Sequence, residues 1–111
     1  MKDPLALRDE VLALVNATLR SPAETDPALR EAVARRSTEH AGLAEPTATL
    51  PETLEGYVEK VARFAYKTTD EDIAALRASG YSEDQILEVT LSAALGASLA
   101  RLERGLELLR E

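Results

Sequence analysis

Apolar residues recur every three or four positions along most of the chain, which is the spacing of one face of an α-helix. This spacing predicts five helices, separated by proline, glycine and helix-capping residues. The predicted helices cover residues 4–20, 26–40, 49–66, 69–79 and 82–109. The clearest apolar stripe runs from Leu54 to Ala65, and no segment shows the alternation typical of a strand. We therefore expect an all-α fold of about five helices in which the last helix is long.

Capping residues mark several of the predicted helix ends. Thr49–Glu52 and Ser82–Gln85 match the capping box, in which the first and fourth side chains satisfy each other's free amides. Gly80 stands where the end of the fourth helix favours a left-handed residue. Residues 41–49 have neither helical spacing nor paired charges, and we expect a surface loop there.

The last predicted helix is roughly 40 Å long at 1.5 Å per residue, and its middle, Ala93–Ser98, consists mainly of small residues. Small side chains let another helix approach closely. Gly96 costs the helix about 1 kcal/mol of propensity, which indicates a packing reason for its presence. Because so short a chain cannot cover a helix of this length, we expect a homo-oligomer formed through the long C-terminal helix.

Composition limits the function classes that the chain can support. The 111 residues predict one helical domain, residues 1–111. A net charge of −7 without a basic stripe argues against nucleic acid and against an anionic membrane as partners. The fourth and fifth helices have a helix–turn–helix rhythm, but Glu83, Asp84 and Glu88 would then face phosphates. No signal peptide or membrane span is visible, so we expect a cytoplasmic protein.

Few residues are candidates for chemistry, and the sequence predicts no metal site and no cofactor. The chain has no cysteine, which excludes disulfides and thiolate nucleophiles. The single histidine, His40, is a candidate acid–base group or a solvent-facing residue at a helix end. Glu88 and Arg101 lie on the last helix and are candidates for a partly buried site, or are simply solvated or ion-paired. The acids Asp70–Asp72 suit the positive end of a helix dipole better than a cation site.

Aromatic residues offer one further candidate site. Tyr57, Phe64 and Tyr66 belong to the third predicted helix. They would either line an apolar pocket or form plain core, and aromatic residues at helical spacing are more often core.

The C-terminal half of the chain resembles a known superfamily. The segments Tyr57–Leu76 and Ala78–Glu88 resemble the short helix, glycine turn and long helix of the AhpD-like, carboxymuconolactone decarboxylase-like superfamily. The resemblance extends over residues 55–109. It implies an all-helical fold and assembly as a homo-oligomer.

The peroxidase branch of that family uses a glutamate, a CxxC pair and a downstream histidine. Here Ala97 and Ala100 stand where the two cysteines would be, and Arg104 stands where the histidine would be. No catalytic residue carries over, and thiol peroxidase activity is excluded. The resemblance therefore implies a cysteine-free member that acts as a non-redox binding or accessory protein. The alternative is a decarboxylase-like lyase acting on a small carboxylated molecule, with Arg63, Arg101 and His40 as the available groups.

Overall fold

The computed structural model describes residues 4–42 and 49–110, which form five α-helices and one 3-10 turn. The elements are α1 (Pro4–Arg20), α2 (Pro27–Gly42), α3 (Glu52–Phe64), the turn η1 (Ala65–Lys67), α4 (Asp70–Ala78) and α5 (Glu83–Arg110). No strand occurs within these two ranges. The prediction of an all-α fold with a long last helix is confirmed.

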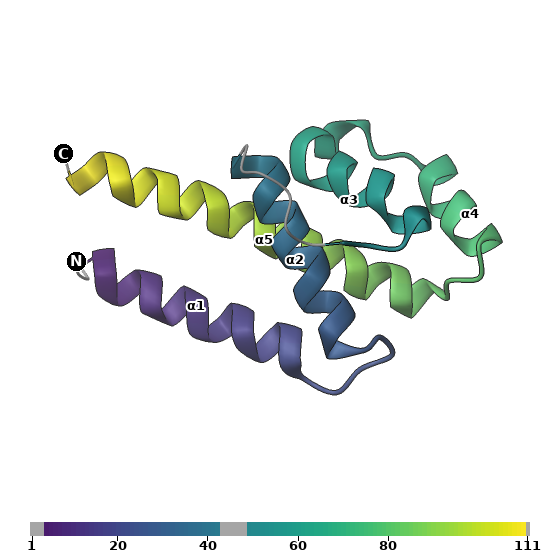
Figure 1. Ribbon diagram of the computed structural model, residues 1–111, viewed down its shortest axis with the longest axis horizontal. Helices are drawn as coiled ribbons and strands as arrows, with labels where there is room; N and C mark the ends of the chain where they lie inside the picture. Colours follow the sequence, from purple (N-terminus) through teal and green to yellow (C-terminus); the bar gives the residue numbers. More distant parts are fainter. Residues whose placement is uncertain (1–3, 43–48, 111) are drawn as a thin grey trace.

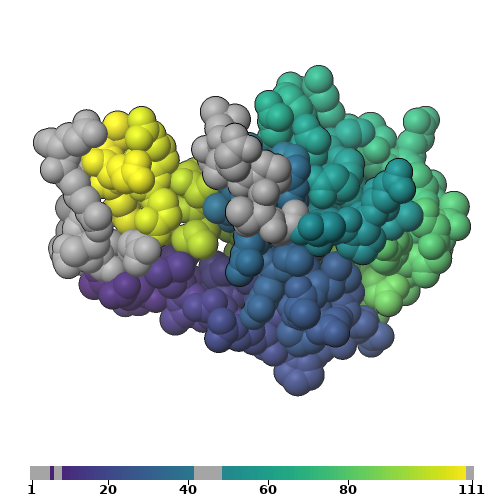
Figure 2. Space-filling model, viewed as in Figure 1, coloured from purple at the N-terminus to yellow at the C-terminus, as the bar shows by residue number. Residues whose placement is uncertain are grey.

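The molecule is elongated because α5 extends beyond the helices that cover it. Its principal extents are 47 × 28 × 25 Å. Helix α2 crosses the middle of α5, and α3 and α4 lie at one end of the molecule (Figure 1). At the other end, α1 lies beside the C-terminal half of α5 and runs in the opposite direction. In the space-filling view, α1 (purple) lies below the C-terminal part of α5 (yellow) toward this end (Figure 2).

The main core lies where α2, α3 and α5 meet. Val33, Leu54, Val58 and Val89 are each at most 1% exposed at this junction. Their helical spacing within each element gives every helix one apolar face. A second, smaller cluster joins α1 to α2 through Val15, Leu19 and Ala34. In α3, the buried residues Leu54 and Val58 belong to the predicted apolar stripe.

Helix α2 crosses α5 at Ala93–Ser98, the segment of small residues that predicted the close approach of another helix. A Cβ atom built on Gly96 would clash with the backbone of Ala34. The hydroxyl of Ser37 donates to the carbonyl oxygen of Ala93, and that of Thr38 donates to Gly96 O at 2.8 Å. Gly96 therefore has the packing reason that we expected, and the helix that approaches it belongs to the same chain.

The helix ends agree with the sequence in part. The Ser82–Gln85 capping box is confirmed, since the Ser82 amide donates to Gln85 Oε1 at 2.9 Å and the Gln85 amide to Ser82 Oγ at 3.1 Å. Gly80 has a φ of 104° and closes α4 with the hydrogen bonds of a Schellman motif. The Thr49–Glu52 box was wrong, because Pro51 is the N-cap of α3 and makes no side-chain cap. In the predicted loop 41–49, α2 continues to Gly42, and residues 43–48 lie outside the described part of the chain.

Candidate functional site

The three residues predicted as candidates for chemistry, His40, Glu88 and Arg101, make separate contacts in separate parts of the molecule. His40 lies near the C-terminal end of α2, and Glu88 contacts the connection that precedes the N-terminal end of α2. Arg30, which lies near Glu88, is ten residues before His40 on α2. This separation corresponds to about 15 Å along the axis of the helix. Arg101 contacts the end of α3. The structure therefore does not bring the three into one site.

His40 connects α2 to α3. Its Nε2 lies 3.1 Å from Glu55 Oε1, and the same oxygen accepts a hydrogen bond from Arg36 Nε at 2.7 Å. The side chain of His40 is only 9% exposed. This buried arrangement differs from the predicted solvent-facing alternative. Because its Nε2 is already held by Glu55, the contact fits a structural ion-pair network between two helices.

Glu88 holds the connection between α1 and α2. Its Oε1 accepts hydrogen bonds from the Thr25 amide at 2.8 Å and the Thr25 hydroxyl at 2.5 Å, and Oε2 accepts from the Glu24 amide at 3.1 Å. Burial acts to raise the pKa of Glu88, but these hydrogen bonds and the charge of Arg30 outweigh it, so the pKa lies below its ordinary value. Glu88 is therefore a bound, ionised carboxylate rather than a proton donor.

Arg30 stabilises the same connection from the other side. It was not among the residues predicted to form a site. It is 3% exposed, and its guanidinium donates to the carbonyl oxygens of Thr18, at 2.8 Å, and Ser21. These carbonyls belong to the end of α1, where a helix leaves its last acceptors without partners. One feature of the sequence could have indicated this role of Arg30. The arginine lies four residues after the helix-capping Asp26, on the same side of α2 as the apolar residues Leu29 and Val33.

Arg101 performs the same task at α3. Its Nη2 donates to the Ala62 carbonyl oxygen at 2.8 Å, within the last turn of that helix. A cation at a helix C-terminus also interacts favourably with the helix dipole. The two arginines therefore each donate to carbonyl oxygens at the C-terminal end of a helix. Arg30 and Glu88 also line one hollow of about 270 Å³, beside Thr18 and Leu91, and neither His40 nor Arg101 lines it.

The aromatic residues do not line a common pocket. Tyr57 is buried and its hydroxyl lies 2.6 Å from Thr90 Oγ1. The ring of Phe64 is covered by the cations of Arg63 and Lys67, at 5.3 and 5.0 Å from the ring centre. Tyr66 is 81% exposed. Tyr57 is thus core, as one alternative predicted, while Phe64 and Tyr66 belong to the surface around η1.

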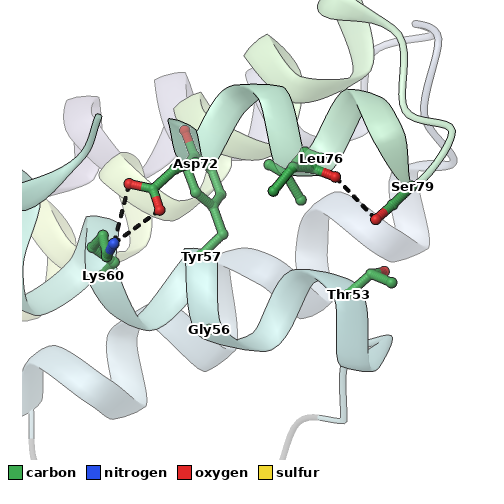
Figure 3. Close-up of a pocket in the computed structure, with 8 residues that line it drawn as sticks. Thr53, Gly56, Tyr57, Lys60, Asp72, Leu76 and Ser79 are labelled. Atoms are coloured by element: carbon green, nitrogen blue, oxygen red, sulfur yellow. Dashed lines mark hydrogen bonds and ion pairs between the residues drawn. The ribbon is translucent and has the colours of Figure 1, made fainter. Parts of the chain in front are cut away.

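A groove of about 350 Å³ runs between α3 and α4, and its lining combines apolar and charged groups (Figure 3). Each side contributes four residues with the i, i+3, i+4, i+7 spacing of one helical face. The residues that line it are Thr53, Gly56, Tyr57 and Lys60 on α3, Asp72, Ala75 and Leu76 on α4, and Ser79 at the C-cap of α4.

One end of the groove is closed by an ion pair. Lys60 Nζ donates to Asp72 Oδ1 at 2.9 Å and to Oδ2 at 3.1 Å, as Figure 3 shows. Oδ2 also accepts the Thr69 amide at 2.9 Å. The Lys60 hydrogen bond, followed by that of the Thr69 amide, holds the pKa of Asp72 below its ordinary value. The sequence pattern predicted only an interaction of Asp72 with the helix dipole. Its bond to Lys60 depends on the packing of α4 against α3.

Neither a metal centre nor a membrane helix is found in the described residues. No group of three histidine, aspartate or glutamate side chains within residues 4–42 and 49–110 is arranged to hold a metal ion. None of the helices in those ranges combines the length and the apolar character that crossing a membrane demands. Comparison with models of protein families, with curated proteins and with solved structures finds no match.

Proposed function

We propose that this chain is a self-assembling helical protein of the AhpD-like type, which acts as a non-redox binding or accessory protein. The observation that supports assembly is a row of exposed apolar residues on the outer face of α5. Leu87 and Leu91 are 57% and 47% exposed, and Leu109 is 75% exposed. A patch of exposed apolar side chains on a folded domain is often an interaction site.

The exposed row follows one face of α5 and is interrupted by Arg101, which is also exposed. Its members follow one another at intervals of three, four or seven residues, which keeps them on the same side of a helix. They are Leu87, Leu91, Ala94, Ser98, Gly105 and Leu109. Val89, Ala93 and Ala97, which are fully buried, lie on the opposite face, against α2 and α3. The crossing helix α2 therefore leaves the outer row uncovered.

The row suits a second copy of the chain running in the opposite direction. In an antiparallel pair of α5 helices centred on Ser98, Leu91 of one copy meets Gly105 of the other, and Leu87 meets Leu109. A Cβ atom on Gly105 would have no neighbour within 4 Å in the chain, so the position offers space to a leucine. The row from Leu87 to Leu109 on α5 gives an interface about 33 Å long at 1.5 Å per residue. A large side chain opposite a small one favours close helix packing.

Neither thiol nor lyase chemistry is part of the proposal. The chain has no cysteine. The groups that a lyase would need, His40 and Arg101 among them, are held in separate contacts with Glu55 and Ala62. No arrangement of the described residues favours the decarboxylase-like alternative, and we put forward binding or accessory function alone.

The test of assembly is the solution mass, measured by light scattering on a sizing column. We expect a dimer or a larger oligomer of the wild type. The double variant L87E/L91E places charge in the row and should run as a monomer with unchanged helical circular dichroism. The matched control A74E/A78E adds the same two charges to exposed positions of α4 and should keep the wild-type mass. A monomeric wild type, or equal dissociation of both variants, would contradict the proposed interface.

A further inference from the structure

The groove between α3 and α4 is open in its middle because the residues there are small. Gly56 lies between the Lys60–Asp72 ion pair at one end and the hydroxyl-bearing Thr53 and Ser79 at the other (Figure 3). Ala75 also lines the groove and stands between Asp72 and Ser79 along the chain. Packed helices normally fill such central positions with interdigitating side chains. Here the buried residues Tyr57 and Leu76 form an apolar floor. The helix pair therefore encloses a hollow with one charged end.

Gly56 has no packing or backbone reason to be glycine. It lies inside α3, where glycine costs about 1 kcal/mol relative to alanine. A Cβ atom there would meet nothing within 4 Å, whereas one on Gly96 would clash with the backbone of Ala34. Gly96 is thus required by a crossing helix. The consequence of Gly56 is that the groove stays open.

The charged end of the groove favours a particular polar group. Lys60 has three N–H donors and directs two hydrogen bonds at one carboxylate, so it retains a donor. Oδ1 of Asp72 accepts only the Lys60 bond among the described residues and retains an acceptor site. A donor and an acceptor therefore lie side by side, and their charges cancel. A carboxylate is attracted by Lys60 but repelled by Asp72, and the reverse holds for an ammonium, so neither ion gains a net attraction from the pair. A neutral amide can use both groups.

We propose that this groove binds an uncharged amphipathic small molecule, with its apolar body over Gly56 and Ala75 and an amide or hydroxyl group at the Lys60–Asp72 pair. An amide carbonyl accepts from Lys60 while its N–H group donates to Asp72. The net charge of −7 acts further against anions. The volume of about 350 Å³ suits a small ligand. This inference rests on the binding half of the proposed function and names its ligand class.

Three probes with the same aromatic body separate the possible polar groups. Benzamide, benzoate and benzylamine would each be titrated into the ¹⁵N-labelled chain while backbone amide shifts are recorded. We expect shifts for residues 53–60 and 72–79 with benzamide, at a dissociation constant of about 1 mM, which is reasonable for so small a ligand. Benzoate and benzylamine should bind about tenfold more weakly, because each places a like charge beside one member of the pair.

Matched variants place the binding in the groove. A75L fills the groove from α4, and A74L adds the same side chain at the neighbouring exposed position. Benzamide binding should be lost in A75L and retained in A74L. K60M removes the donor, and it should reduce the preference for benzamide over benzylamine to less than about threefold.

The proposal would be overturned by binding of benzoate or benzylamine as tight as that of benzamide, or by benzamide shifts that survive in A75L. Absence of any shift in the groove with millimolar benzamide would do the same. The mass measurement on L87E/L91E is independent of these titrations. Failure of ligand binding is therefore distinguishable from failure of the assembly proposal.

Discussion

Gly96 of α5 lies directly beneath Ala34 of α2, so that an added Cβ atom would be 2.8 Å from the Ala34 carbonyl carbon and 2.9 Å from its Cα. The neighbouring atoms are backbone and cannot turn aside as a flexible side chain would. The closeness lets Thr38 reach the Gly96 carbonyl oxygen. The crossing of the two helices thus depends on the absence of a single methyl group.

The substitution G96A should lower the free energy of unfolding by about 3 kcal/mol, because α2 must move away from α5 and lose core contacts. Chemical denaturation followed by circular dichroism measures the change. G56A is the matched control, since a Cβ atom at Gly56 of α3 meets no neighbour within 4 Å and Gly56 lies outside the proposed α5 interface. This control should leave stability unchanged or raise it by up to about 1 kcal/mol. Equal effects of the two changes would show that the crossing is looser than described.

Glu88 and Thr25 support a second prediction. The substitution E88Q removes the charge and one acceptor from a carboxylate that receives three hydrogen bonds. We expect a loss of about 1–2 kcal/mol of stability at neutral pH, as for other hydrogen bonds to charged groups. E107Q serves as a control, because Glu107 pairs with Arg104 on the exposed surface and should change stability by less than about 0.5 kcal/mol. Comparable losses in both variants would contradict a special role of Glu88.

Arg30 should be needed for the docking of α1 specifically. Lysine cannot reproduce a planar fork that donates to both the Thr18 and Ser21 carbonyl oxygens. In R30K we expect the amides of α1 to exchange hydrogen about tenfold faster, while those of α3 keep their rates, because the loss is local. The control R35K changes an exposed arginine of the same helix and should leave α1 exchange unchanged. Uniform acceleration throughout R30K would mean that Arg30 supports the whole core instead.

The helices were predictable from the sequence because apolar spacing and capping residues are local signals. Ser82 and Gln85, three residues apart, satisfy each other in the predicted way. The partners of Glu88 were not predictable, since Thr25 is sixty-three positions away and is placed by the packing of α2 on α5. The small residues around Gly96 indicated that another helix would approach α5 closely, but they did not indicate which helix. Asp72 similarly has a local role at its own helix end and a distant one at Lys60.

The two roles of Asp72 predict how stability responds to acid. Its pKa is depressed in the folded chain relative to its ordinary value of 3.8, so folding favours the ionised form. Its contribution is therefore fully present above the ordinary value and is lost as the pH falls through the depressed pKa. In D72N that contribution is absent at every pH. The difference in urea midpoint between wild type and D72N should be largest near neutral pH and shrink toward about pH 3.

D70N is the control, because it alters an acid in the same helical turn for which no bond to Lys60 is found. The proposal that Asp72 holds α4 against α3 would be wrong if the two variants showed the same pH profile.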